Sequence, residues 1–324
     1  MLSVFITIDT EFSPRFPNGR ASGFVREIAR EIDGDTADGQ FGLAYQLGIL
    51  DTFGLRAVFF VESLFASAIG LDPLRRIVGM IQDRGHEVQL HLHPEWLSFV
   101  TSSILTLGPR PYLKDYTEDE QTLLIARGIQ NLRDCGVRSL CAFRAGKYGA
   151  NFDTLRALER NGLLYDTSHN TCYLGHACDM DTTELLLQPT KICGVYEFPI
   201  SFFRDGPGHY RHLQLCACSS QELINALTMA WERGWYSLVL VSHSFELIKR
   251  RKQTKKPALV DRVVLQRFER LCRFLAENRD KFRTAVFSEI VSESIPEVTP
   301  SRPLHSGVHR TLHRYYEQLI RRIT

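Results

Sequence analysis

Short apolar segments alternate with amphipathic helical segments about seven times along the chain, and this alternation is typical of a parallel α/β fold. We predict strands at residues 4–8, 57–61, 88–92, 138–143, 195–200, 236–241 and 284–287. We predict helices at residues 41–53, 74–84, 118–134, 152–161, 220–233 and 259–278. The composition does not change within this series, which favours a single domain. The count of about seven strands favours a barrel over an open sheet.

The segments outside this series are expected to be connections or a tail. Residues 12–40, rich in Gly, Pro, Arg and Asp, are predicted to form a long connection that lies over a site, and residues 168–192 a loop. We divide the chain into a barrel over residues 1–300 and a basic helical tail over residues 301–324.

The tail is predicted to be an amphipathic helix. We expect Leu312, Tyr316 and Leu319 to pack on the barrel or on a partner, with Arg310, Arg314, Arg321 and Arg322 in solvent. His305, His309 and His313 recur every four residues and would share one helix face, which makes a second metal site the alternative.

The composition excludes several classes of protein. A formal charge of +2 on 324 residues implies no general attraction to nucleic acid. The eight cysteines include no Cys-x-x-Cys pair, so free thiols in a reducing compartment are expected. The first apolar run stops at Asp9, too early for a signal peptide, and no run reaches the ~18 apolar residues of a membrane span. We therefore expect a cytoplasmic protein without a transmembrane segment.

Two histidines lie together at the end of one predicted strand. Residues 88–92 alternate between apolar and polar, so His91 and His93 project from the same face. Pro94 cannot donate to a sheet ladder and ends the strand there. Neutral imidazole is a frequent metal ligand, and Glu95 and Trp96 follow directly.

Polar side chains also follow the other strands. They are Asp9 and Glu11, Arg144, Asp166 and His243, each at or just past a strand's carboxyl end. Any one of them could be a turn or cap residue, but the carboxyl ends of barrel strands carry the chemistry of such folds. Asp9 and Glu11 could serve as a metal ligand and a general base. Arg144 is suited to holding a carboxylate in a bidentate manner.

Five motifs occur in an order that resembles a known family. They are Thr7-Ile8-Asp9-Thr10-Glu11, Gly85-His86-Glu87-Val88 followed by His91, Arg144-Ala145-Gly146-Lys147-Tyr148, Tyr165-Asp166-Thr167-Ser168 and Val239-Leu240-Val241-Ser242-His243. In these motifs the chain resembles the polysaccharide deacetylases of the NodB-homology type, carbohydrate esterase family four. The resemblance implies a single-domain, distorted (β/α)7 barrel that holds a divalent metal ion and removes acetyl groups from N-acetylated sugars.

The resemblance also implies roles for individual residues. Asp9 would be the general base and Arg144 would orient it, the backbone N–H of Tyr148 would bind the oxyanion, and His243 would be the general acid. Trp96 and Asp166 are expected to contact the substrate.

The chain departs from the family pattern at two positions. The family's metal-binding aspartate aligns with Thr10, and its second metal histidine aligns with Glu95. The resemblance is therefore to a divergent branch associated with surface-polysaccharide synthesis. We assign the metal ligands as Glu11, His91 and His93. Glu95 is the alternative to His93 as the third ligand. Asp9 could exchange roles with Glu11.

We therefore predict a metal-dependent carbohydrate N-deacetylase in surface-polysaccharide synthesis, such as that of lipopolysaccharide. The metal would be one Zn ion, with Co, Mn or Ni as alternatives, and the substrate a free, nucleotide-linked or lipid-linked amino sugar. Two alternatives stay open: a catalytically silent sugar-binding barrel, and a cyclic imide or ureide hydrolase on the same fold.

Overall fold

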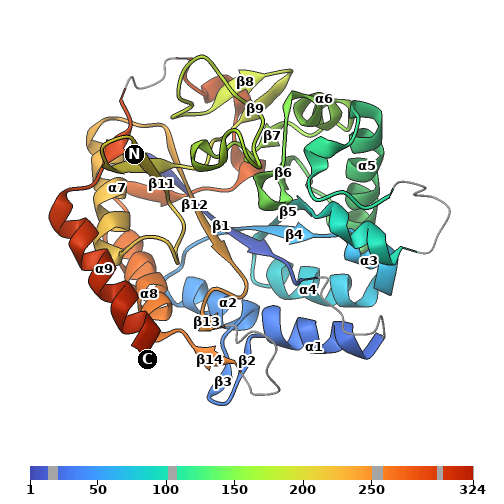
Figure 1. Ribbon diagram of the computed structural model, residues 1–324, viewed down its shortest axis with the longest axis horizontal. Helices are drawn as coiled ribbons and strands as arrows, with labels where there is room; N and C mark the ends of the chain where they lie inside the picture. The colour runs from blue at the N-terminus through green and yellow to red at the C-terminus, as the bar shows by residue number, and fades with distance from the viewer. Residues whose placement is uncertain (14–20, 101–107, 250–257, 298–301, 324) are drawn as a thin grey trace. The chain divides into compact units, whose positions relative to one another are not determined.

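A computed structural model describes residues 1–13, 21–100, 108–249, 258–297 and 302–323. The fold is mixed α/β (Figure 1). The chain forms two compact units, one of Met1–Ala57, Ser201–Ala285 and Pro300–Thr324, the other of Val58–Ile200 and Val286–Thr299. The α/β class is thus confirmed, whereas a barrel over 1–300 with a tail over 301–324 stays a prediction.

The first unit is built around the strand β1 (Leu2–Thr10), whose nine residues are all buried. It pairs in parallel with β12 (Ser237–His243) and with β15 (Phe282–Thr284). Its largely apolar sequence suits such a strand because both of its faces are covered. The helices of this unit are α1 (Ala21–Glu31), α2 (Leu43–Thr52), α7 (Ser220–Glu232), α8 (Arg262–Glu277) and α9 (Val308–Ile323).

Short strands complete the first unit. β10 (Phe202–Gly206) and β11 (His209–His212) form an antiparallel hairpin, and β16 (Leu304–His305) pairs in parallel with β10. Two further pairs are β2 (Asp35–Thr36) with β3 (Gly39–Gln40), and β13 (Ile248–Lys249) with β14 (Leu259–Val260).

The second unit carries a run of parallel strands. Its strands are, in spatial order, β4 (Val58–Glu62), β5 (Glu87–Leu92), β6 (Ala142–Ala145), β7 (Tyr165–Asp166) and β9 (Val195–Glu197), with β8 (Thr190–Ile192) antiparallel at the edge. Its helices are α3 (Phe65–Ile69), α4 (Asp72–Gln82), α5 (Glu118–Asp134) and α6 (Phe152–Arg160). β5 lies between β4 and β6, so the histidine strand is an interior one.

Two predicted helix starts are explained by their caps. The Thr117 hydroxyl accepts the N–H of Glu120, whose carboxylate accepts the N–H of Thr117. Ser219 and Glu222 make the same reciprocal pair before α7. Each box satisfies backbone donors that the first turn of a helix leaves without partners.

The structure corrects the predicted connection at residues 12–40. Its described part contains α1 and the β2–β3 hairpin. The helical signal was present as Phe24, Ile28 and Ile32 at four-residue spacing, and the two isoleucines are buried. The surrounding Gly, Pro and Arg residues obscured it.

The prediction for the tail is wrong in two respects. His305 lies on β16, outside the helix that begins at Val308, so the three tail histidines do not share a helix face. Leu312, Tyr316 and Leu319 are exposed rather than packed on the barrel, so packing on a partner stays a prediction, and Arg314 is buried rather than solvated. Helix α9 therefore packs on the rest of the first unit through its charged face.

Candidate active site

In the first unit, the carboxyl ends of β1 and β12 bring three predicted site residues together. Asp9 is directly opposite His243 in the parallel register of the two strands. Nε2 of His243 lies 3.9 Å from a carboxylate oxygen of Asp9 and 4.0 Å from one of Glu11. One imidazole edge thus faces two carboxylates, as expected if strand ends form the site.

The opposite edge of the His243 ring is held by Glu246, a residue that the sequence prediction missed. Nδ1 of His243 donates to the Glu246 carboxylate at 2.9 Å, and Glu246 is almost fully buried. Burial alone would lower the pKa of His243, but the hydrogen bond and charge of Glu246, with Asp9 and Glu11, raise it to about 9. The three-residue spacing from His243, in the turn after the strand, was the available signal.

In the second unit, the two predicted histidines lie next to each other. The ring centroids of His91 and His93 are 4.9 Å apart, which confirms that both project to the same side. Nδ1 of His91 lies 2.8 Å from the backbone carbonyl of Arg144, to which it must donate. This bond leaves Nε2 of His91 as the atom that can bind a metal ion, because the contact at Nδ1 fixes the tautomer and the orientation of the ring.

His93 is supported on several sides. Nδ1 of His93 lies 3.5 Å from the carboxylate of Glu95, which also binds the ammonium of Lys147 at 2.7 Å. The bond to His93 is the main reason that the pKa of Glu95 falls to about 2. The backbone N–H of His93 donates to Glu62 at 3.3 Å, and burial raises the pKa of Glu62 to about 7.

Gly146 is required by the position of the His93 ring. A Cβ atom at residue 146 would lie 2.7 Å from three ring atoms of His93. The next two residues, Lys147 and Tyr148, both have positive φ angles, of 55° and 58°. Consecutive non-glycine residues in this region are strained, and such strain is concentrated at functional sites.

Glu11 of the first unit, with His91 and His93 of the second, makes up the group of described residues that could hold a metal ion. Each residue offers one ligand atom. The donor set suits a divalent ion such as Zn, which binds one carboxylate and two imidazoles in catalytic sites. The Nδ1 atoms of both histidines face acceptors, which favours Nε2 ligation. Glu95 is outside this group.

Arg144 is completely buried in the second unit. Its guanidinium lies 4.5 Å from the centroid of the Phe60 ring and donates to the backbone carbonyl of Thr167 at 3.2 Å. A planar cation over an aromatic face is a stable arrangement for a buried arginine.

The two residues assigned to the substrate lie in the interior. Trp96 is fully buried against Phe65, so it has no surface for a substrate and serves the core. Asp166 is also fully buried and accepts the hydroxyl of Ser168 at 2.7 Å, and Ser168 in turn accepts the N–H of Ala145. Asp166 therefore supports the end of β6 rather than facing a ligand.

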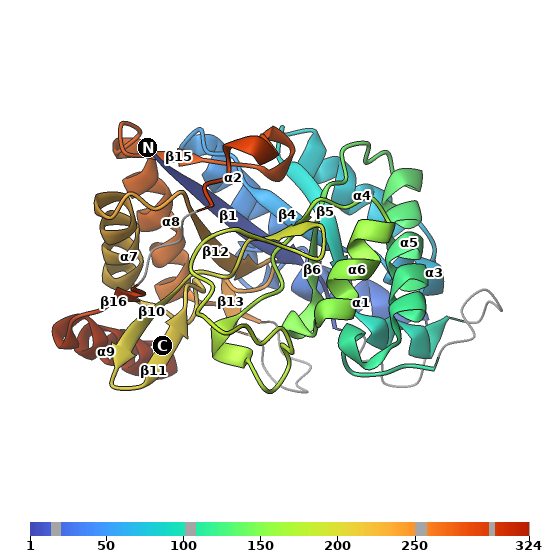
Figure 2. The same ribbon diagram turned by 90° about the horizontal axis from the view of Figure 1, so that it is seen from above.

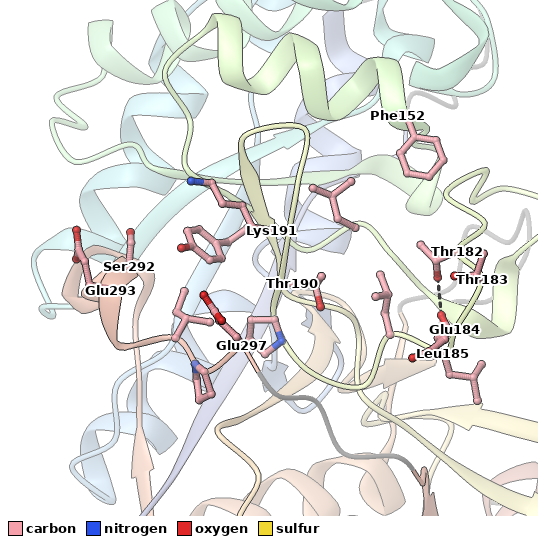
Figure 3. Close-up of a pocket in the computed structure, with 16 residues that line it drawn as sticks. Phe152, Thr182, Thr183, Glu184, Leu185, Thr190, Lys191, Ser292, Glu293 and Glu297 are labelled. Carbon is pink, nitrogen blue, oxygen red and sulfur yellow. Dashed lines mark hydrogen bonds between the residues drawn. The ribbon is translucent and has the colours of Figure 1, made fainter.

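A separate pocket of about 640 Å³ lies in the second unit (Figure 3). Thr190 and Lys191 of β8 line it, with Glu184 from the preceding loop and Glu297 from the far end of the chain. None of the predicted site residues lines this pocket. Its lining includes acidic and basic side chains but no histidine or cysteine. The group of described residues that could hold a metal ion includes none of the residues that line this pocket.

Comparisons with known proteins identify the fold. No protein-family model matches the sequence, and no curated protein matches it. A putative polysaccharide deacetylase from Mycobacterium smegmatis matches the structure with a TM-score of 0.54 and 17% sequence identity, over 93% of this chain and 94% of that chain. The chain thus has a NodB-like polysaccharide deacetylase fold, which confirms the predicted distorted (β/α)7 architecture.

Two further structures are similar at lower scores. A family 4 carbohydrate esterase from Streptomyces lividans, in complex with acetate, has a TM-score of 0.43 and 13% identity, over 92% of this chain and 97% of that chain. A family 4 pseudoenzyme from Bacillus anthracis has a TM-score of 0.41 and 11% identity, over 94% of this chain and 69% of that chain.

Proposed function

We propose that this protein is a metal-dependent amide hydrolase that removes an acetyl group from an N-acetylated sugar or sugar precursor. The observation that carries the proposal is the Glu11, His91 and His93 group, together with the approach of Asp9 and His243 to each other. One carboxylate and two imidazoles suit a catalytic divalent ion, and a second carboxylate and a third imidazole supply a base and an acid.

Each residue has a separable part in this mechanism. Zn, or Co, Mn or Ni in its place, would be held by Glu11, His91 and His93, and when bound it lowers the pKa of water and polarises an amide carbonyl. Asp9 accepts a proton from the attacking water. His243, anchored through Nδ1 to Glu246, carries the proton on Nε2 and donates it to the departing amine.

The remaining assignments concern charge and orientation. We assign the backbone N–H of Tyr148 to the developing oxyanion, because Tyr148 lies in the strained turn that directly follows β6. Arg144 orients the general base. Glu95 is assigned to positioning His93 rather than to the metal, since it faces Nδ1 and Lys147.

The setting that we propose is cytoplasmic synthesis of a surface polysaccharide, such as lipopolysaccharide. The support is the resemblance of the motifs to a branch associated with such synthesis. The substrate would be a nucleotide-linked or lipid-linked N-acetylated amino sugar. Among the helices of the described residues, none has both the length and the hydropathy needed to span a bilayer.

The metal assignment is tested by metal analysis of the purified protein. We expect about one divalent ion per chain in the parent and its loss in His91→Ala, because removing one of three protein ligands leaves too few. His176→Ala, at an exposed loop histidine, is the matched control and should keep the ion. A parent protein that binds no divalent ion, or full retention in His91→Ala, would refute the assignment.

The reaction is tested by acetate release from free, nucleotide-linked and lipid-linked N-acetylated amino sugars. Asp9→Asn should lower turnover by roughly 10²–10⁴ while the ion stays bound, because the amide cannot accept the proton. If none of these substrates releases acetate, the silent sugar-binding barrel is the remaining function. Ring opening without acetate would identify an imide or ureide hydrolase.

A further inference from the structure

Gln214, a residue that the sequence prediction did not single out, lies beside the candidate general acid His243. It belongs to the segment of residues 213–215, which follows the β10–β11 hairpin of the first unit (Figure 2). Two backbone hydrogen bonds of 2.9 Å, both to Val241, hold this segment parallel to β12. The backbone therefore fixes Gln214 next to the end of the strand that carries His243.

The side-chain amide of Gln214 bridges a carboxylate and a histidine. Its Nε2 donates to Oε1 of Glu246 and lies 3.4 Å from Nδ1 of His243. Its Oε1 lies 2.8 Å from Nε2 of His212, which must donate to it. Because an ionised carboxylate only accepts hydrogen bonds, the amide nitrogen has to face Glu246, and the amide oxygen then faces His212. The contact with His212 thus fixes the orientation of the amide.

The Glu246 carboxylate is held by several donors besides His243. The backbone N–H and the thiol of Cys216 donate to it at 3.2 and 3.3 Å, and the hydroxyl of Ser242 donates at 3.3 Å. Burial would raise the pKa of Glu246, but the hydrogen bonds and charge of His243, with the hydrogen bonds of Gln214 and Cys216, lower it below its usual value. The carboxylate is therefore ionised, and it cannot turn without breaking several hydrogen bonds.

We propose that Gln214 is a positioning residue for the general acid, acting on His243 through Glu246. This role rests on the proposed function, in which Nε2 of His243 donates a proton to the departing amine. The bond from Nδ1 to Oε1 of Glu246 sets the ring so that Nε2 faces the carboxylate of Asp9. Gln214 donates to the same oxygen and so restrains the atom that holds the ring. Misplacing a reacting group by about 1 Å can cost on the order of 10²-fold in rate.

The test compares an N-acetylated amino sugar with an acetate ester that has an acidic leaving group, which needs little protonation to depart. Gln214→Met keeps the length of the side chain but loses its hydrogen bonds. We expect kcat for the amide to fall about tenfold or more at an unchanged KM, with the ester largely spared. The ratio of the two kcat values is the readout, because a loss of folded protein lowers both equally. Gln121→Met, at a buried glutamine that bonds Tyr116 and Thr154, is the matched control and should keep the ratio.

A second readout does not require turnover. With isotopically labelled histidine, the Nδ1–H proton of His243 should give a downfield magnetic resonance signal, assigned by its absence in His243→Gln. Gln214→Met should broaden or abolish this signal, because a less restrained carboxylate lets the proton exchange with water faster. If the parent releases no acetate, the proposed deacetylase fails, and the signal alone then decides the positioning role. An unchanged signal or an unchanged ratio in Gln214→Met, or equal changes in Gln121→Met, would overturn the proposal.

Discussion

Asp166 and Glu197 place two carboxyl groups in the fully buried interior of the second unit. Burial, and then the charge of Asp166 and its hydrogen bond, raise the pKa of Glu197 well above its usual value. Two adjacent carboxylates cannot both ionise easily without water. Glu197 therefore keeps a proton in the folded chain at pH values where it would lose it in the unfolded chain.

This pair predicts how stability depends on pH. The folded state binds more protons than the unfolded state above about pH 4.5, so the free energy of unfolding should fall as pH rises through the window up to the raised pKa. In Glu197→Gln the amide keeps a donor and an acceptor but does not titrate. Relative to the parent, the variant should therefore gain stability with rising pH, by up to about 1.4 kcal/mol per pH unit.

Urea unfolding at several pH values between 5 and 8 measures this effect, with the window following from the linkage relation. Glu232→Gln is the control, because this glutamate is exposed and should follow the parent curve. Parallel curves for the parent and Glu197→Gln would mean that Glu197 is ionised in the folded protein.

At the scale of elements, the turn that follows β6 positions the histidine that follows β5. Gly146 directly follows β6 and lies against the ring of His93. The backbone carbonyl of Arg144 orients the ring of His91. The short separation leaves no room for a side chain at residue 146. The end of β6 and the turn after it therefore fix the positions of both histidine rings.

Gly146→Ala is predicted to weaken metal binding without unfolding the protein. The added Cβ would lie 2.7 Å from the ring of His93, so the ring must move, and displaced ligands or their supports typically lower metal affinity by about 10–100-fold. Competition with a chromogenic chelator gives the affinity, and circular dichroism reports the fold. Gly79→Ala, in a helix with open space at the new Cβ, is the control and should leave the affinity unchanged. Unchanged affinity in Gly146→Ala would show that the ring position is not critical.

At the scale of the whole molecule, the C-terminal helix is held by charges contributed from distant parts of the sequence. Asp205 on β10, Glu222 on α7 and Arg267 on α8 all pair with residues of α9. Buried ion pairs contribute little net stability while they are intact, but removing one partner leaves a buried charge uncompensated.

Arg314→Met should therefore destabilise the protein strongly. We expect the free energy of unfolding to fall by about 3 kcal/mol, because Asp205 and Glu222 both lose a buried partner. Arg310→Met, on the same helix but only half-buried, should change it by less than about 0.5 kcal/mol. Chemical denaturation compares the two. Equal effects would mean that the buried pairs of Arg314 do not anchor the helix.

Local patterns predicted many elements closely. The helix from Glu118 to Asp134 has the predicted bounds, because its capping box and the positive φ of Gly136 both act locally. Residue spacing likewise predicted that His91 and His93 project together. Glu246 was missed, since its acceptance of the His243 proton depends on how the turn after β12 folds back.

The sequence by itself determined the α/β class, the order of the elements and the strand ends that carry polar residues. These features follow from periodicity, caps and turns, which involve neighbouring residues only. Tertiary structure alone decided that Trp96 and Asp166 are interior, and that α9 turns its apolar face outward. An amphipathic pattern defines two faces of a helix but not which one docks. Here Asp205 and Glu222, about a hundred residues away in sequence, select the charged face because Arg314 pairs with both.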